Sequence, residues 1–252
     1  MKFLTEKPYI WAHKGASGYL PENTLEAFEL AAKMNADGVE LDVGLTKDKR
    51  VVVIHDEKID KVSNGQGAIS MYTLDELKKF DFGYHFYNEL RGYRIPTLEE
   101  VLELLAPTGL MINIELKVVP GPALPAACVE IVRKMGMEDR VIYSSFDHMQ
   151  LMRAKAADPD ALIAPLYHIM LANPWNYAKD IGAFAVHPQD RLIPQIDGYI
   201  DRCHEAGIRV HAWTTDDPDT IKYLLNNNCD AIITNYPDRA VQIRDEFLRT
   251  NA

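Results

Sequence analysis

Short apolar runs alternate along the chain with longer segments in which apolar residues recur at three- and four-residue spacing. Eight runs have the composition of buried strands: YIWAH (9–13), GVELDVGL (38–45), LMINIELK (110–117), RVIYSSF (140–146), ALIAPLY (161–167), AFAVHP (183–188), RVHAWTT (209–215) and DAIITN (230–235). Segments with a helical period follow most of them: 23–35, 124–136, 148–157, 193–207, 217–227 and 237–249. Eight strand–helix alternations in 252 residues predict an α/β fold, the (β/α)8 TIM barrel.

A doubly wound open sheet is the alternative for such an alternating pattern. No GxGxxG follows any predicted strand, which favours the barrel. The stretch from about 56 to 96 breaks the rhythm with SNGQG and FGYHFYNELRGYRIP, which are rich in glycine, asparagine and aromatic residues. We expect this stretch to be a small subdomain inserted after the second strand of a single domain spanning 1–252.

The composition narrows the range of partners. The chain has 27 lysines and arginines against 37 acids, a net charge of −10 and no basic block, so we expect no nucleic-acid partner. Its three cysteines, Cys128, Cys203 and Cys229, have no CxxC spacing and are expected to be reduced. No apolar run has the length of a signal peptide or of a membrane span. We therefore expect a cytoplasmic protein without stable membrane insertion.

Charged residues interrupt two of the strand-like runs. Glu40 and Asp42 stand two positions apart, so both side chains point to one face, and Glu115 and Lys117 repeat this spacing on the next strand. In a barrel, active sites lie at the carboxyl ends of the strands. Three carboxylates there suit a hard divalent cation, Mg²⁺ or Ca²⁺, better than Zn²⁺. The alternative is a structural network in which Lys117 or another cation neutralises the acids.

Two histidines end strand-like runs, His13 after YIWA and His55 after VVVI. Beside an acidic cluster they are candidates for a general acid and a general base, although each alone has a structural interpretation. Lys14 and Lys117 are candidates for binding a phosphate oxygen, the alternatives being a surface lysine and a salt-bridge partner. Trp213 either lines a substrate pocket or packs the barrel.

Several motifs, taken in order, resemble those of the glycerophosphodiester phosphodiesterase family over nearly the whole chain. HKGASGYLPENTLEAF is similar to the family's HRG…PENT opening, and VELDVGLTKDKRVVVIHD to its E-x-D segment followed by a His-Asp pair. IELK resembles the third-strand E-x-K, HAWTT the late tryptophan segment, and DEKIDKVSNGQG the continuation after the His-Asp pair. Each motif is weak alone, and the combination in this order is specific.

The resemblance implies a barrel with a small inserted subdomain. It implies hydrolysis of a glycerophosphodiester, a small-molecule substrate, to sn-glycerol 3-phosphate and an alcohol. It also implies a divalent metal, Mg²⁺ or Ca²⁺ with Mn²⁺ also possible, held by Glu40, Asp42 and Glu115. His13 and His55 are implied as the acid–base pair.

The residue after His13 and the lysine of IELK are implied as phosphate contacts, which places Lys14 and Lys117 in the substrate site. Lys14 departs from the family, which usually has arginine there. A lysine keeps the charge but lacks the planar fork that grips two phosphate oxygens. Asn23, within PENT, is expected either to cap the first helix in a capping box with Glu26 or to support the site.

Other functions are compatible with parts of this pattern. A lysophospholipase D-type phosphodiesterase would need an apolar entrance, which the aromatic residues of 82–93 would supply. A catalytically silent barrel that binds a phosphorylated ligand is disfavoured because both histidines and all three acids are present. A sugar-phosphate isomerase is disfavoured because NYPDRA, after the last strand, is not a glycine-rich phosphate loop. The head group, the native metal and the oligomeric state stay open.

Overall fold

Eight parallel strands close into a barrel in the computed structural model, which describes residues 7–251. The barrel strands are β1 (Tyr9–His13), β2 (Gly38–Leu45), β4 (Met111–Leu116), β5 (Val141–Ser145), β6 (Leu162–Tyr167), β7 (Ala185–Pro188), β8 (Arg209–Ala212) and β9 (Ala231–Thr234). They follow one another around the barrel in chain order, and β1 closes it by pairing with β2 on one side and β9 on the other. The predicted (β/α)8 fold is confirmed, with one barrel strand in each predicted run.

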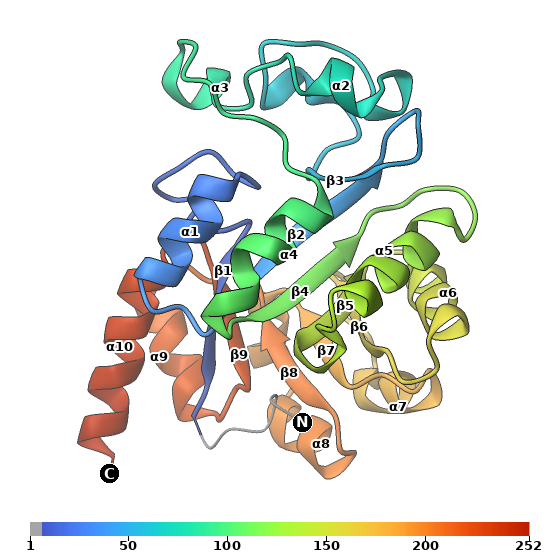
Figure 1. The fold of residues 1–252 in the computed structure, drawn as a ribbon. Coiled ribbons are helices and arrows are strands. Elements are labelled where there is room, and N and C mark those ends of the chain that lie inside the picture. Colours follow the sequence, from blue (N-terminus) through green and yellow to red (C-terminus); the bar gives the residue numbers. More distant parts are fainter. Residues whose placement is uncertain (1–6, 252) are drawn as a thin grey trace.

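Helices cover the outside of the barrel (Figure 1). They are α1 (Leu25–Lys33), α4 (Leu98–Leu105), α5 (Ala123–Lys134), α6 (His148–Ala157), α7 (Pro174–Asp180), α8 (Tyr199–Glu205), α9 (Pro218–Asn226) and α10 (Pro237–Thr250). α4 and α7 fall outside the predicted segments, and the first part of 193–207 is not α-helix but the end of a 3₁₀ helix, η5 (Asp190–Gln195). Within residues 7–251, no helix combines the length and the apolar character needed to cross a bilayer.

Each barrel strand sends alternate side chains to the helical layer and to the barrel interior. On β2, Val39, Leu41 and Val43 are fully buried in the layer beneath the helices. Glu40 and Asp42 lie between them in sequence and therefore point inward. Apolar side chains fill the interior nearer the start of the strands: Tyr9, Trp11, Met111, Ile142, Ala164, Ala185, Ala231 and Ile233. The barrel thus has an apolar base and a polar mouth.

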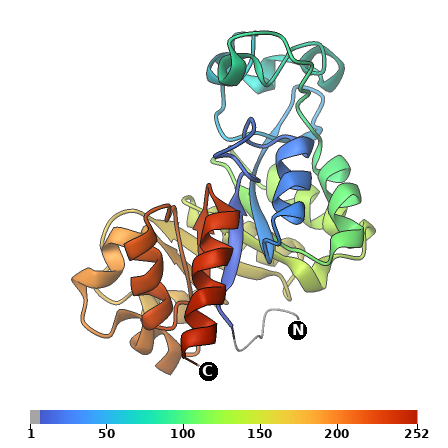
Figure 2. The same ribbon diagram turned by 90° about the vertical axis from the view of Figure 1, so that its left-hand side faces the viewer.

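A small subdomain follows the second barrel strand and lies beyond the carboxyl end of β2 (Figures 1 and 2). It begins with β3 (Val51–Val53), antiparallel to the end of β2, and continues through η1 (Ile59–Lys61), η2 (Ile69–Met71), α2 (Leu74–Leu77) and α3 (Tyr84–Tyr87). It has its own apolar cluster: Val52, Ile54, Ile59, Ile69, Leu77, Phe82 and Ile95. In both views the carboxyl end of α10 lies at the opposite end of the molecule.

The amino-terminal end of α1 differs from the predicted cap. Thr24 is the cap, since its Oγ1 accepts a hydrogen bond from the backbone N–H of Ala27 at 3.3 Å. Asn23 has a left-handed φ of 59°, a conformation that asparagine tolerates. Its amide instead donates to Asp42 Oδ2 at 2.8 Å. The predicted capping box is therefore wrong, and Asn23 contacts the acid cluster.

The cysteines Cys128, Cys203 and Cys229 are free and buried. Burial raises the pKa of the Cys203 and Cys229 thiols to about 12, because an apolar environment disfavours the thiolate. The cysteines are therefore reduced, as the sequence predicts, and their burial makes the thiols unreactive.

Candidate active site

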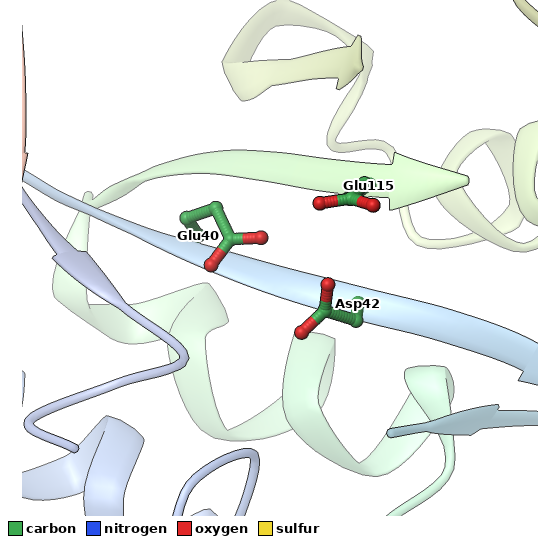
Figure 3. A group of neighbouring side chains, drawn as sticks. All are labelled: Glu40, Asp42 and Glu115. Atoms are coloured by element: carbon green, nitrogen blue, oxygen red, sulfur yellow. The ribbon is translucent and has the colours of Figure 1, made fainter. Parts of the chain in front are cut away.

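Three carboxylates converge at the mouth of the barrel (Figure 3). Glu40 and Asp42 come from β2 and Glu115 from β4, and one oxygen of each lies within 4.8 Å of the others. The parallel pairing of the strands sets Asp42 beside Glu115 and Glu40 beside Asn113. All three acids are buried, with 0–8% of their surface exposed. Carboxylates so close together in a buried site need positive charge nearby.

Lys117 supplies one positive charge to this cluster. Its Nζ lies 2.7 Å from Asp42 Oδ1 and 2.6 Å from Glu115 Oε1. Burial opposes the ionisation of Asp42, but Lys117 and Lys14 outweigh it and lower the pKa of that carboxyl. Burial likewise opposes the charge of Lys117, and Asp42 and Glu115 outweigh it and raise the pKa of the amine. One lysine balances one carboxylate of the three.

Glu40 and Glu115 bear the negative charge that Lys117 does not balance. Burial, and then repulsion from Asp42, raises the pKa of Glu115 to about 7 and that of Glu40 well above its ordinary value. Such shifts arise where charged groups lack a counter-ion. A set of three hard oxygen ligands with surplus negative charge fits a divalent cation.

His13 approaches the acids from the end of β1. Its Nδ1 lies 2.7 Å from Asn235 Oδ1, and its Nε2 lies 3.9 Å from Glu40 Oε2. Asn235 Nδ2 donates to Asp216 Oδ2 at 2.6 Å, which orients the amide so that its oxygen accepts from His13 Nδ1–H. Nε2 is then the ring nitrogen that faces the acids. Burial and the nearby Lys14 lower the pKa of His13 to about 4, so the imidazole is neutral at neutral pH.

His55 approaches from the subdomain, just beyond β3. Its Nδ1 lies 2.7 Å from Asp56 Oδ1, and 41% of the side chain is exposed. Lys61 Nζ lies 2.9 Å from the other oxygen of Asp56. Burial opposes the ionisation of Asp56, but the hydrogen bonds from Lys61 and His55 outweigh it and lower the pKa of the carboxyl. An ionised Asp56 accepts from His55 Nδ1–H and leaves Nε2 for a ligand.

Lys14 is not a solvated surface lysine, because only 10% of its side chain is exposed. It has a left-handed φ of 55°, and its backbone N–H donates to Glu40 Oε2 at 3.0 Å. Its Nζ lies 3.2 Å from Glu22 Oε2. The backbone of Lys14 therefore helps to position one acid of the cluster, and its ammonium lies beside the acid of PENT.

A small cavity separates the acids from an aromatic wall. It is lined by His13, Glu40, His55, Asn113, Glu115, Phe146, Leu166, Trp213 and Ile233. Trp213 follows β8, and its Nε1–H donates to the carbonyl of His187 at 2.7 Å. The ring of Phe146 meets Trp213 edge-on, with centroids 5.4 Å apart. Trp213 thus lines the cavity and also packs against the barrel.

Asn113 and Phe146, which line the cavity, and Asn235, the partner of His13, were not among the site residues expected from the sequence. Asn113 is buried, and neither atom of its amide has a hydrogen-bond partner in the described part of the chain. Buried amides are normally bonded, so Asn113 marks a position for a ligand or a water molecule. Polar residues within predicted strands were the available signal for Asn113 and Asn235. Nothing in the sequence singles out Phe146.

A (β/α)8 barrel with acids, histidines and lysines gathered at its carboxyl-terminal mouth is the architecture of an enzyme. The model of the glycerophosphoryl diester phosphodiesterase family matches residues 13–239. A glycerophosphodiester phosphodiesterase of Caldanaerobacter subterraneus is 38% identical over 240 residues, which are 94% of this chain and 98% of that protein. Another, of Bacillus altitudinis, is 40% identical over 241 residues with the same shares.

A solved structure adds to these sequence relatives. It is a phosphodiesterase of Oleispira antarctica in complex with the product sn-glycerol-3-phosphate, with a TM-score of 0.87 and 30% identity, covering 95% of this chain and 97% of that one. The chain belongs to the glycerophosphoryl diester phosphodiesterase family and is a phosphoric diester hydrolase. The family resemblance of the sequence motifs is confirmed.

Proposed function

We propose that the protein hydrolyses glycerophosphodiesters to sn-glycerol 3-phosphate and an alcohol with the help of a divalent cation. The observation that carries the proposal is the convergence of Glu40, Asp42 and Glu115, two of which line one cavity together with two histidines. The Oleispira antarctica relative, with 30% identity, is in complex with the product sn-glycerol-3-phosphate, which supports the same product here.

Glu40, Asp42 and Glu115 are the residues that would hold the cation, with Mg²⁺ or Ca²⁺ favoured by oxygen ligands and Mn²⁺ also compatible. Such an ion, when bound, acts as a Lewis acid on the phosphodiester. Lys117 contacts two of the three acids and adds positive charge at the same place. Lys14, whose backbone N–H contacts Glu40, contributes a second positive charge, and its ammonium can leave Glu22 for a phosphate oxygen.

His13 and His55 act as the general acid and base. They border the same cavity, and each has an acceptor on Nδ1 that leaves Nε2 to the substrate. One accepts a proton from the nucleophile, and the other donates a proton to the leaving alkoxide as its bond to phosphorus breaks. The nucleophile is either water or the substrate's own glycerol hydroxyl; the hydroxyl would release the alcohol and give a cyclic phosphate, which water then opens to sn-glycerol 3-phosphate. Trp213 offers an apolar face to the glycerol carbons.

A second candidate is lysophospholipase D activity on a lipid diester. The observation that favours it is apolar surface in the subdomain, where Phe86 is 47% and Leu90 is 66% exposed. Turnover of a lysophospholipid compared with glycerophosphocholine separates the two activities.

We further infer that the reaction takes place in the cytoplasm and that the chain is a single domain with its insertion at about 56–96. The free, buried cysteines support a reducing compartment. β3 links the subdomain to the barrel. Val52 belongs to the apolar cluster of the subdomain, Val51 and Val53 belong to the main core, and β3 pairs with the end of β2, which supports one continuous unit.

The test uses purified protein, a panel of glycerophosphodiesters and Mg²⁺, Mn²⁺ or Ca²⁺, with released glycerol 3-phosphate as the readout. We expect product only with a cation, and we expect Glu115→Gln to bind the cation far more weakly in a titration. Glu103→Gln, an exposed acid of α4, is the matched control and should behave as wild type. Full activity after exhaustive EDTA treatment would contradict the metal site. Failure to cleave any diester would contradict the function.

A further inference from the structure

A second, larger cavity opens next to the catalytic cavity. It has a volume of about 370 Å³, against about 50 Å³ for the catalytic cavity. It lies between the turn that joins β2 to β3 and the segment that follows β4, which are held together by the pairing of β2 with β4. His55 lines both cavities, and Lys117 lines the larger one.

Apolar and cationic side chains share the walls of this larger cavity. The apolar ones include Leu45, Ile54, Ile69, Val118 and Val119. Two lysines of the β2–β3 turn, Lys47 and Lys49, also line it. A cavity with this lining and volume is suited to a small organic group.

The turn that carries the two lysines is well ordered by local hydrogen bonds. Thr46 N–H donates to the carbonyl of Arg50 at 3.0 Å, and Lys49, at a left-handed φ of 63°, donates its N–H to the carbonyl of Thr46 at 3.0 Å. The intervening Asp48 holds the turn together, because its Oδ1 accepts from Thr46 Oγ1 at 2.6 Å and from Leu74 N–H at 3.1 Å, and it keeps its negative charge. The ordered backbone of the turn therefore fixes the Cα positions of the two lysines.

The charges at the cavity favour an anion. In the described part of the chain, neither Lys47 nor Lys49 forms an ion pair within 4.0 Å. Of the two acids that line the cavity, Asp56 is neutralised by Lys61 at 2.9 Å, which leaves Glu57 as the acid without such a partner. Lys117 is paired with Asp42 and Glu115, so two lysines and one glutamate remain unpaired among the described residues that line the cavity, a local surplus of one positive charge. Two further acids lie close to these lysines, Asp48 in the same turn and Glu76 near Lys47, but neither lines the cavity.

The two cavities match the two arms of a phosphodiester. His55 borders both cavities, so a phosphodiester that is cleaved beside His55 can extend one arm into each of them. The small cavity, with its aromatic wall of Phe146 and Trp213, suits the glycerol arm, which all these substrates share. The larger one suits the alcohol, which varies in size.

We propose, on the basis of the function proposed above, that the larger cavity receives the leaving alcohol and that Lys47 and Lys49 favour alcohols that carry a negative charge. The substrate class is then a glycerophosphodiester whose second alcohol bears a phosphate or carboxylate. A cationic alcohol such as choline meets the lysines unfavourably.

The experiment compares three diesters of sn-glycerol 3-phosphate, with glycerol phosphate, glycerol or choline as the leaving alcohol. Loss of the diester phosphorus signal by NMR gives kcat/KM for each. We expect the anionic substrate to be preferred to the cationic one. Lys47→Ala/Lys49→Ala should reduce that preference by about 2–30-fold, the range for two exposed charges. Lys47→Glu/Lys49→Glu should reverse it.

A matched control removes the same total charge elsewhere. Lys33 and Lys134 are exposed and each pairs with a glutamate one helical turn away, at the ends of α1 and α5. Lys33→Ala/Lys134→Ala should leave the preference unchanged. This inference would be overturned if the control variant lost the preference for the anionic diester to the same extent, or if wild type had equal kcat/KM for all three diesters. Either result would leave the proposed function intact. Failure to cleave any diester would overturn both.

Discussion

Replacing Lys117 by methionine tests whether the acid cluster is balanced as the structure shows. The side chain is 19% exposed, and its ammonium contacts Asp42 and Glu115 at 2.7 and 2.6 Å. Methionine keeps much of the apolar stem and removes the charge. We expect the metal-free variant to lose stability because three buried carboxylates are left without their counter-charge.

The size of the stability loss depends on how the three carboxylates respond to the missing positive charge. Removing one partner of a buried ion pair typically costs about 3–5 kcal/mol. Protonation of Asp42 offers an escape, and its cost depends on pH. For a carboxyl with an ordinary pKa of 3.8, holding the proton costs about 4.4 kcal/mol at pH 7 and about 1.6 kcal/mol at pH 5, at about 1.36 kcal/mol per pKa unit.

The sign of the pH dependence follows from the same linkage. The folded variant binds more protons than the folded wild type between pH 5 and 7, so its stability falls relative to wild type as pH rises. The penalty of Lys117→Met should therefore be largest at neutral pH and shrink by about 3 kcal/mol toward pH 5. A bound divalent cation replaces the missing charge and should restore much of the loss.

The assay is thermal unfolding of wild type and variant at pH 5 and pH 7, in EDTA and with saturating Mg²⁺ or Ca²⁺. For a chain of this size, 1 kcal/mol corresponds to about 2–4 °C in Tm, so a loss of about 3–4.4 kcal/mol predicts a decrease of roughly 6–18 °C at pH 7 without metal. Lys78→Met is the control, since Lys78 pairs with Glu100 at 2.6 Å in a partly exposed position. It should cost less than about 1 kcal/mol and be insensitive to metal.

Three results would refute parts of this reasoning. A wild-type Tm at pH 7 would show that Lys117 does not balance the acids. An equal decrease at pH 5 and pH 7 would assign the loss to packing and not to charge. A decrease that no divalent cation reverses would argue against Glu40, Asp42 and Glu115 as its ligands.

Other predictions address the catalytic groups and the barrel interior. His13→Ala and His55→Ala should each lower kcat by roughly 10²–10⁴-fold without unfolding the protein; a folded variant with wild-type kcat would make that histidine structural. Lys14→Ala should lower kcat/KM by roughly 10–150-fold, the effect of a lost hydrogen bond of about 1.5–3 kcal/mol to a charged group, and Lys14→Arg should retain most activity; an unchanged kcat/KM for the alanine variant would remove Lys14 from the site. Burial lowers the pKa of His187 to about 3, so the group charges only on unfolding and stability should fall as pH drops from 6.5 toward 3. His187→Phe should flatten that fall by up to about 1.36 kcal/mol per pH unit in urea titrations, and an unchanged slope would contradict it.

The barrel could be predicted because its strands are buried and its helices are amphipathic, which leaves a strong periodic signal. All eight strands fall in predicted runs. α4 was missed although Thr97 and Glu100 form a capping box, because the irregular stretch before it hides the helix start. α7 has only seven residues, too few for a clear period.

The acids of the site could be predicted for a related reason. Glu40, Asp42 and Glu115 interrupt apolar strands, and the two-residue spacing fixes the face to which they point. The partner of His13 could not be predicted, because Asn235 lies 222 residues away and meets it only when β1 pairs with β9. The role of Asn23 could not be predicted either, since a left-handed φ decides whether its amide caps the helix or contacts Asp42.

The sequence left two interpretations of the acid cluster, a metal site or a network neutralised by lysine. The structure makes them compatible. Lys117 contacts Asp42 and Glu115 but leaves the pKa of Glu40 and Glu115 raised by burial and mutual repulsion. If lysines balanced all three carboxylates, this repulsion would be absent. If no lysine were present, the metal-free barrel would be less stable still. Lys117 therefore lowers the electrostatic cost of burying the acids, and the remaining repulsion is what a bound cation would relieve.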